Sequence, residues 1–560
     1  MRVVLSQAGR LLAAASFVAT TSAVAGAQAP PAAAPAQPAQ ASPQPAGPVL
    51  TLTVDEAVRL GLENNLDLQV QRLDPQVQDE NVRQARTAWA PSLVGGFTYN
   101  NADQPPDSLF SGAADVLKTD IFSGSAGVQQ LLPWGASYSA TWDALRSESN
   151  NQFTNFNPRL RSGLALSFAQ PLLRDRQVDS ERTQLVVSQR NREISDVQLR
   201  ATVVNTIRDV KTAYWELAVA IANLASQRQS LELAQQTLKD NRTRVQVGTM
   251  APIDIVEAEA EVARTEEAVI IAEAAIKQTE DRLRSLIFDP KTPAFWQTTL
   301  QPTGYEADLQ ALQPVDGEAA AQAALEKRTD LQRAMKELDN VEANLKYYRN
   351  QTLPQLNLQA DLSGAGLGGT QLLFGDGFPP PVIGTADAPF SDVLGDVFSF
   401  NYPTWAIGVT VSYPLGTSAA ETSVARTRLQ LQQQRLQIQN LELQIGTQVR
   451  EAARSVNTNI KRIDATRASR VLSERRLEAE QKKFGVGMST SFLVFQAQRD
   501  LTTARNNELR ALIDYAKSKV DFEALQEAAI GGGGVTIGST GTALATTAGT
   551  QTATALQRQQ

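Results

Sequence analysis

The longest regular pattern in the chain is helical and runs from about residue 178 to residue 247. Apolar residues recur there at steps of three and four, as at Val203, Ile207, Val210 and Tyr214, and no proline interrupts the segment. This spacing predicts a single helix, and about 70 residues make a rod of roughly 100 Å. A similar segment runs from about 418 to 484. Both exceed the roughly 8 to 20 residues usual in compact domains, so we expect them to pack along other helices, as in a coiled coil.

Shorter helical patterns accompany each long one and repeat in the same order. One shorter helix opens each half, at 54–89 and 316–349. Another follows each long helix, at 252–288 and 490–529. A Val-Gly pair ends each long helix, Val247-Gly248 in the first half and Val486-Gly487 in the second. Such a repeat indicates one structural unit used twice. We expect two short helices to lie end to end beside each long one.

The second pattern is a period-two alternation, which predicts β-strands. It is clearest at 405–413, where Trp405, Ile407, Val409, Val411 and Tyr413 alternate with small or polar residues. Similar alternation occurs around 138–142, 164–168 and 356–362. A strand of this length with an apolar face and aromatic ends is typical of a membrane β-barrel. The alternative is a soluble sheet with one buried face.

The two strand regions differ in length. The first, between Pro91 and Pro171, covers 80 positions, and the second, between Pro354 and Pro414, covers 60. The excess includes residues 128–135, whose ending resembles the segment 169–173, so an additional hairpin is an open interpretation. Residues 364–400, rich in Gly, Pro and Asp, are predicted to form a long surface loop.

The N-terminus has the features of a secretory signal peptide, predicted to be residues 1–27. Arg2 and Arg10 supply positive charge, a short apolar run follows, and Ala25-Gly26-Ala27 suits cleavage. An N-terminal membrane anchor is the alternative, but the run is shorter than the roughly 20 residues that span a bilayer. No later uncharged apolar run is long enough, so any membrane placement is expected to use strands. Residues 28–48 are predicted to be an Ala/Pro/Gln-rich linker and 530–560 a disordered Gly/Thr/Ala-rich tail.

Composition narrows the chemistry. The net charge is −7, which argues against a nucleic-acid binder. The chain has no Cys and no His, which excludes disulfides, thiolate nucleophiles and His-based catalysis. No catalytic, cofactor-binding or metal-binding residues are predicted, and we do not expect an enzyme.

Several short motifs, in a fixed and duplicated order, resemble the TolC-type outer-membrane factor family of outer membrane efflux proteins. They mark helix starts, helix–strand junctions, strand ends and helix tips over about residues 50–529. The motifs are Asn65-Leu66-Asp67-Leu68, Ala90-Pro91-Ser92-Leu93, Gln170-Pro171-Leu172, Ala213-Tyr214-Trp215-Glu216-Leu217, Arg244-Val245-Gln246-Val247-Gly248, Leu353-Pro354-Gln355-Leu356, Tyr413-Pro414-Leu415-Gly416 and Lys483-Phe484-Gly485-Val486-Gly487.

The resemblance implies an α+β membrane protein with an internally duplicated helix–strands–helix-hairpin unit. Three copies would form an outer-membrane β-barrel, continued by a long periplasmic α-helical barrel. Each chain would give four strands to a 12-stranded barrel, and we keep this number as the expectation. The first repeat is predicted at 49–290, with barrel strands and loops at 92–171 and a helix hairpin at 178–288. A connecting segment, 291–315, precedes the second repeat at 316–529, with strands and a loop at 355–414 and a hairpin at 418–529.

The resemblance also implies a function and partners. The protein would be a passive exit duct of a tripartite efflux pump or a type I secretion system. It would work as a homotrimer in contact with outer membrane lipids, a periplasmic adaptor and an inner-membrane RND or ABC transporter. The transported substrate is not encoded in this chain.

The candidate site lies at the hairpin tips. The resemblance implies that Val247, Gly248 and Thr249, with Val486, Gly487 and Met488, meet the adaptor. Family members often place acids just after this turn, where they line the constriction. Here Asp254 and Glu257 fall one helical turn apart on one face, and the hypothesis is that they form a cation-attracting ring when three copies assemble. The second half has Leu493 and Gln496 at the matching positions. The alternative is that the two acids merely favour a helix N-terminus.

Two other classes of protein remain open. A secreted structural coiled-coil or interaction protein without channel activity would explain the helices but not the alternating strands. An exported hydrolase would need a pair of acids or a Ser-Lys arrangement, and the sequence singles out neither.

Overall fold

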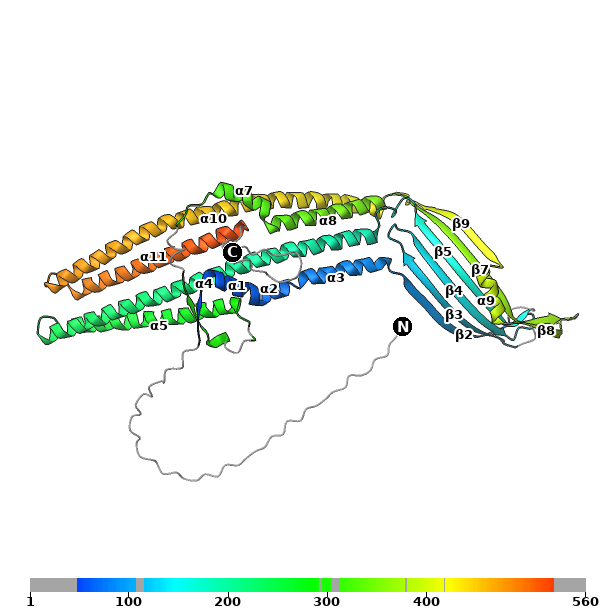
Figure 1. The fold of residues 1–560 in the computed structure, drawn as a ribbon, viewed down its shortest axis with the longest axis horizontal. Helices are drawn as coiled ribbons and strands as arrows, with labels where there is room; N and C mark the ends of the chain where they lie inside the picture. The colour runs from blue at the N-terminus through cyan, green and yellow to red at the C-terminus, as the bar shows by residue number, and fades with distance from the viewer. Residues whose placement is uncertain are drawn as a thin grey trace, which may run out of the picture. The chain divides into compact units, whose positions relative to one another are not determined.

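Two helix hairpins of equal size dominate the structure. The computed structural model describes residues 48–106, 115–289, 291, 295–304, 312–377, 380–416 and 418–527. The first hairpin joins α4 (Ser180–Gln246) to α5 (Ile253–Ile287), and the second joins α10 (Ala419–Gly485) to α11 (Ser491–Leu525), as Figure 1 shows. In each hairpin the first helix has 67 residues and the second has 35. The repeat in the sequence is therefore also a repeat in the structure. The predicted signal peptide, most of the linker and the tail lie outside the described residues.

Side-chain caps fix where the long helices begin. The Asp179 carboxylate accepts a hydrogen bond from the Arg182 amide at 2.6 Å, which caps α4. Ser418 and Glu421 form a reciprocal capping box at the start of α10. Both helices end in the Val-Gly turns that the sequence predicts.

The shorter helices that open each half are broken, and here the predicted single helices are wrong. Residues 54–89 form α1 (Val54–Asn64), α2 (Leu66–Gln71), α3 (Asp74–Arg86) and the short η1 (Thr87–Trp89). Residues 316–349 fall in α7 (Gly317–Lys327) and α8 (Thr329–Gln351). The breaks occur because Asn65 is extended and caps α2 through the Leu68 amide, and because Arg328 is also extended.

The helices form a layer four wide. Near the sheet its order is α3, α4, α8 and α10, and nearer the hairpin tips it is α5, α4, α11 and α10. Two end-to-end junctions join the short helices, as expected. The Asn64 side chain donates to the carbonyl of Ile287 at 3.0 Å, and the Thr329 amide donates to Glu527 at 2.7 Å.

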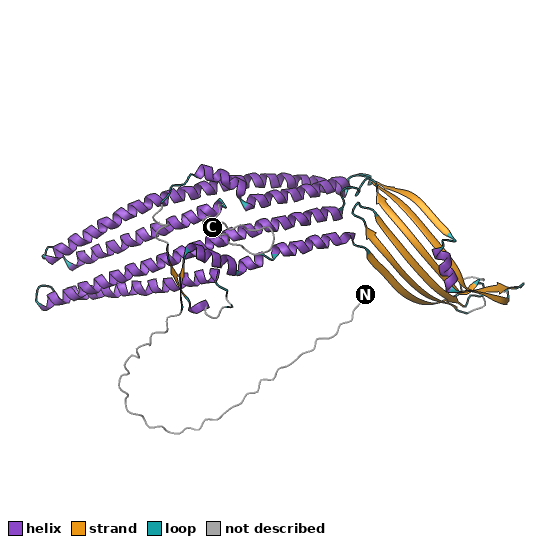
Figure 2. Ribbon diagram, viewed as in Figure 1, coloured by secondary structure: helices purple, strands orange, loops and turns teal. Residues whose placement is uncertain are grey.

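Seven strands form one antiparallel sheet, the large orange sheet in Figure 2. Its order is β2, β3, β4, β5 and β7, and β8 and β9 both pair along the far edge of β7. The sheet is therefore six strands wide. The strands are β2 (Ser92–Gln104), β3 (Leu117–Leu131), β4 (Ser137–Ser149), β5 (Phe156–Pro171), β7 (Gln355–Phe374), β8 (Val382–Ala388) and β9 (Pro403–Ser412).

This width corrects the four strands that the resemblance implies. The additional pair is the hairpin of β3 and β4, which accounts for the longer strand region of the first half. It lies within the sheet, because β3 pairs with β2 along its length and β4 pairs with β5.

The predicted surface loop over 364–400 is also wrong for most of its length. Strand β7 continues to Phe374, β8 follows, and α9 (Phe390–Phe398) packs back on the sheet. The glycines that suggest a loop serve close packing instead. A Cβ at Gly364 would lie 2.8 Å from the carbonyl oxygen of Val397 on α9.

A small parallel sheet pairs β1 (Val49–Leu52) with β6 (Thr299–Pro302), a feature that the sequence does not suggest. It covers the core around the fully buried Tyr214, whose hydroxyl donates to the carbonyl of Thr303 at 2.9 Å. Within the described part of the chain, no helix combines the length and apolar character needed to cross a membrane.

Candidate functional site

The two Val-Gly turns share one backbone geometry. Gly248 and Gly487 both have a φ of +78°, in the left-handed region that glycine adopts without strain. The Thr249 amide donates to the carbonyl of Arg244 at 2.9 Å, and the Met488 amide donates to the carbonyl of Lys483 at 2.8 Å. These bonds close the C-termini of α4 and α10 in the same way.

The turns present apolar side chains to solvent. Val247 is 69% exposed, Val486 is 72% exposed and Met488 is 78% exposed. Side chains of this kind gain free energy when a partner covers them. The tips are therefore chemically suited to bind a protein surface.

Two polar contacts link the hairpins near their tips. The Arg244 guanidinium donates to the carbonyl of Phe484 at 3.2 Å and lies 4.5 Å from the centre of its ring. The Ser491 hydroxyl donates to a carboxylate oxygen of Asp254 at 2.7 Å. Because Arg244 and Asp254 belong to the first hairpin and their partners to the second, these bonds hold the two hairpins of one chain together.

The two candidate constriction acids have different surroundings. Asp254 is half-buried and faces the second hairpin through Ser491, which is 2% exposed. Glu257 is exposed on the next turn of α5. The ring of acids thus remains a prediction, and within one chain Asp254 acts as a link between hairpins.

A third acid near the tips was missed at the sequence level. Glu480 accepts a hydrogen bond from the Ser489 hydroxyl and another from Lys483, and these bonds hold the pKa of its carboxyl below the usual range. Ser489 and Lys483 lie nine and three residues after Glu480 in the same hairpin. The short spacing from the end of α10 to the turn was therefore the signal in the sequence that could have identified this acid.

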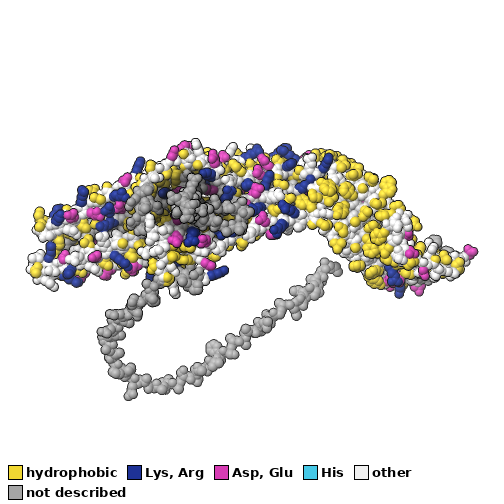
Figure 3. Space-filling model, in the orientation of Figure 1, with side chains coloured by type: hydrophobic (Ala, Val, Ile, Leu, Met, Phe, Trp, Pro, Cys, Tyr) yellow, Lys and Arg dark blue, Asp and Glu magenta, His cyan; other side chains and the backbone are white. Residues whose placement is uncertain are grey.

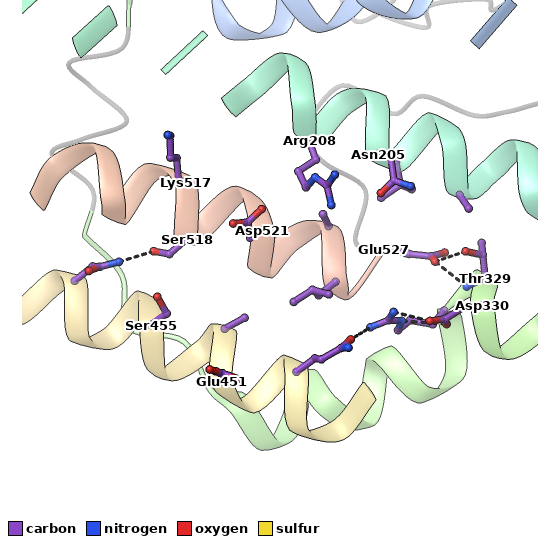
Figure 4. Close-up of a pocket in the computed structure, with 18 of the residues that line it drawn as sticks. Asn205, Arg208, Thr329, Asp330, Glu451, Ser455, Lys517, Ser518, Asp521 and Glu527 are labelled. Carbon is purple, nitrogen blue, oxygen red and sulfur yellow. Dashed lines mark hydrogen bonds and ion pairs between the residues drawn. The ribbon is translucent and has the colours of Figure 1, made fainter. Parts of the chain in front are cut away.

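Two cavities lie between the hairpins, on either side of the direct contact between α4 and α11. A cavity of about 880 Å³ lies between α4, α8, α10 and α11, and Figure 4 shows Arg208 and Asp521 directed toward it. Burial raises the pKa of the Asp521 carboxyl. A second gap of about 690 Å³, nearer the tips, is lined by residues of all four hairpin helices. No group of three metal-binding side chains occurs among the described residues.

A buried lysine lies between the halves. Lys211 on α4 is 7% exposed, and its ammonium is 3.7 Å from the carboxylate of Glu523 on α11. Burial lowers the pKa of Lys211, and Glu523 opposes that shift. This pair is a structural feature of the contact between α4 and α11.

The lateral edges of the sheet carry unpaired strands. Among the residues that the structure describes, β2 has a partner only on its β3 side and β9 only on its β7 side. Their apolar side chains are exposed, with Phe97 at 82% and Trp405 at 71%. Figure 3 shows hydrophobic side chains gathered over the sheet region. An unpaired, exposed apolar edge is a template for another strand.

Both lateral edges of the helical layer carry exposed apolar side chains. On α10, Leu429 and Leu436 are exposed with heptad spacing, and on the opposite edge Val70 and Val77 are exposed. Each edge therefore carries an exposed apolar seam.

Known proteins share both the sequence pattern and the fold. A family model described as "Outer membrane efflux protein" matches residues 57–287 and 320–526. A search of curated proteins gave no match. Among solved structures, the chain is similar to the CmeC outer membrane channel of Campylobacter jejuni, with 16% identity, a TM-score of 0.59, and 84% of this chain and 85% of that one covered.

Two further channels have the same fold. For VceC of Vibrio cholerae the identity is 15%, the TM-score is 0.57, and 84% of this chain and 96% of that one are covered. For MtrE of Neisseria gonorrhoeae the identity is 17%, the TM-score is 0.56, and 84% of this chain and 88% of that one are covered. At these identities the structural likeness supports the fold, whereas the family model covers both repeats. The chain belongs to the outer membrane efflux protein family.

Proposed function

We propose that three copies of this chain form a passive duct from the periplasm to the exterior, with the sheets closed into an outer-membrane barrel. The observation that carries the proposal is the pair of unpaired edges. Because β2 and β9 lie at opposite sides of the sheet, their contact between copies is heterologous, and such contacts close into a ring when the rotation permits. Three is the number that the resemblance to the family implies.

The faces of the sheet support its placement in lipid. Leu356, Leu358 and Leu362 lie on the same face as the apolar residues of β9, and the other face is small or polar. This is the distribution expected when one face meets lipid and the other a water-filled lumen. An open edge is not tolerated in lipid, so closure between copies follows from the same placement.

The helical layer and the tips give the remaining parts of the proposal. Helices α4 and α10, at roughly 100 Å each, are long enough to carry a tunnel deep into the periplasm. The exposed Val247, Val486 and Met488 would meet a periplasmic adaptor, and an inner-membrane transporter would supply the energy. The partner system would be a tripartite efflux pump or a type I secretion system, and the duct itself needs no catalytic group.

The test is a disulfide cross-link between copies, which the absence of native Cys makes unambiguous. Leu93→Cys on β2 and Val411→Cys on β9 lie on the same face, near the helical end of each strand. In outer-membrane fractions of cells that export the full chain, this pair should give covalent dimers and trimers. The matched control pairs Leu93→Cys with Thr410→Cys, which faces the other side, and should give far fewer.

A chain recovered as a monomer from the soluble periplasm would overturn the proposal. So would a trimer in which neither cysteine pair cross-links, because the subunits would then meet elsewhere. The secreted structural protein without channel activity predicts the first of these outcomes.

A further inference from the structure

The hairpin of β3 and β4 is built into the sheet. Strand β3 pairs with β2 from Ser92↔Gln129 to Gln104↔Leu117, and with β4 from Leu131↔Ser137 to Thr119↔Ser149. Strand β4 in turn pairs with β5. The hairpin therefore separates β2 from β5 by two full strands rather than lying on either face of the sheet.

The hairpin also continues the two chemical faces of the sheet. One row of directly paired residues crosses all six strands and is apolar throughout: Leu93, Val128, Ala140, Leu166, Leu362 and Trp405. The next row points to the opposite face and is polar or small: Ser92, Gln129, Ser139, Ser167, Asp361 and Ala406. Strands β3 and β4 thus carry the same lipid-facing and lumen-facing pattern as the other four.

The turn of the hairpin is anchored to the helical layer. The side chain of Gln130 donates to the carbonyl of Trp89 at 2.8 Å, at the end of η1. Gly135 has a φ of +91°, and a Cβ there would lie 2.7 Å from the Arg182 guanidinium at the start of α4. Ala136 is fully buried. The turn therefore fills the space between the helix that leads into β2 and the helix that leaves β5.

We propose that this hairpin enlarges the barrel, so that three copies close an 18-stranded rather than a 12-stranded cylinder. The proposal rests on the trimeric duct proposed above. With strands about 4.8 Å apart and tilted by about 40°, 18 strands give a backbone diameter of roughly 36 Å and 12 strands roughly 24 Å. Six strands per chain would then stand above four helices, and the tunnel or its tips, rather than the barrel wall, would set the narrowest width. Barrels of this size leave an aqueous channel.

The width can be measured by double electron–electron resonance between spin labels at one position in the three copies. Val409→Cys on β9 is exposed on the apolar face. Three equivalent backbone sites on a cylinder lie 1.73 radii apart, which gives roughly 31 Å for 18 strands and roughly 21 Å for 12. The reach of the label adds the same amount to both. We expect the longer distance.

A label on the helical tunnel serves as the control. Gln444→Cys on α10 is exposed, and its distance depends on the four-helix layer alone. A full-length trimer with a single, well-defined tunnel distance but the shorter, 12-stranded distance at Val409 would overturn the 18-stranded barrel and leave the duct intact. Absence of a fixed distance at both sites would overturn the duct itself.

Accessibility of labels within the hairpin gives a second, independent readout. Val128→Cys should be reached by oxygen dissolved in lipid and Gln129→Cys by a water-soluble nickel complex. Val409→Cys and Thr410→Cys on β9 should show the same contrast. Contrast in β9 without contrast in the hairpin would place β3 and β4 outside the barrel wall and would refute the proposal.

Discussion

The link between Ser491 and Asp254 makes a quantitative prediction about the tips. Ser491→Ala removes the 2.7 Å hydrogen bond between the two hairpins of each chain. A bond to a charged acceptor contributes about 1.5–3 kcal/mol. Because Asp254 is only half-buried and water can replace the hydroxyl, we expect about 1–1.5 kcal/mol per chain.

The effect should be larger in the proposed trimer. If the three pairs of hairpins separate together, the losses add to about 3–4.5 kcal/mol, which shifts the equilibrium toward separated tips by roughly two to three orders of magnitude. In planar bilayers, trimers with Ser491→Ala should therefore show a higher mean conductance than the unaltered protein. The free energy of unfolding of each chain should fall by only the smaller amount.

Ser489→Ala is the matched control. It removes a serine-to-carboxylate bond of the same chemistry, but its acceptor, Glu480, belongs to the same hairpin. Conductance should therefore stay near that of the unaltered protein. If Ser489→Ala and Ser491→Ala raise conductance equally, or if neither does, the link between hairpins does not hold the tips together.

Three further predictions concern the helical layer, the sheet junction and the edges. Glu523→Gln removes the nearest carboxylate of the buried Lys211 ammonium and, because Glu523 is itself 29% exposed and Asp55 remains, should cost about 1–2 kcal/mol in chemical denaturation, whereas Lys211→Met should cost less. Because burial lowers the pKa of Lys211 in the folded chain, the unfolded chain binds more protons between the two pKa values. Stability should therefore rise with pH in the alkaline range, more steeply in Glu523→Gln; a flat profile would refute the assignment. Gly135→Ala should lower the thermal stability of the trimer by more than Gly248→Ala, since both have positive φ but only the first lacks space for a Cβ; equal shifts would contradict the anchored turn. Leu436→Glu should shift native mass spectra from trimers toward monomers because it charges an apolar seam that is 58% exposed in one chain; unchanged trimers would place the subunit contact elsewhere.

The helix hairpins are predictable because their signals are long and local. Periodicity over tens of residues fixes the two long helices, and the Val-Gly turns fix where they end. The breaks at Asn65 and Arg328 are harder to predict, because a cap or an extended residue depends on one side chain and on partners across the fold. Pattern alone therefore joins helices that the structure separates.

The width of the sheet can be predicted only in part from the local sequence. The extra 20 positions between Pro91 and Pro171, and the repeated Leu-Leu motif at 131–132 and 172–173, indicate an additional hairpin. Whether that hairpin joins the sheet depends on long-range pairing with β2 and β5, which alternation within one segment does not reveal. The glycines of β7 suggest a loop for a related reason: they leave room for α9 to pack closely on the strand, and the packing of α9 is not visible in the local sequence.

The hairpin tips, like the sheet, are only partly predictable from the sequence. The sequence identifies Asp254 and Glu257 by their spacing, but only the structure reveals that Asp254 faces Ser491, 237 residues later. Their role as a ring depends on the other copies, and it remains a prediction. Arg244 and Phe484 are likewise brought together only by the packing of the two hairpins.

The central claim is that the edges of this chain are completed by copies of itself. Electron cryo-microscopy of the full chain extracted from outer membranes in detergent tests it most directly. The account predicts a threefold particle in which β2 of each copy pairs with β9 of the next, above a continuous ring of helices. Monomers with an open sheet, or trimers joined through other surfaces, would contradict it.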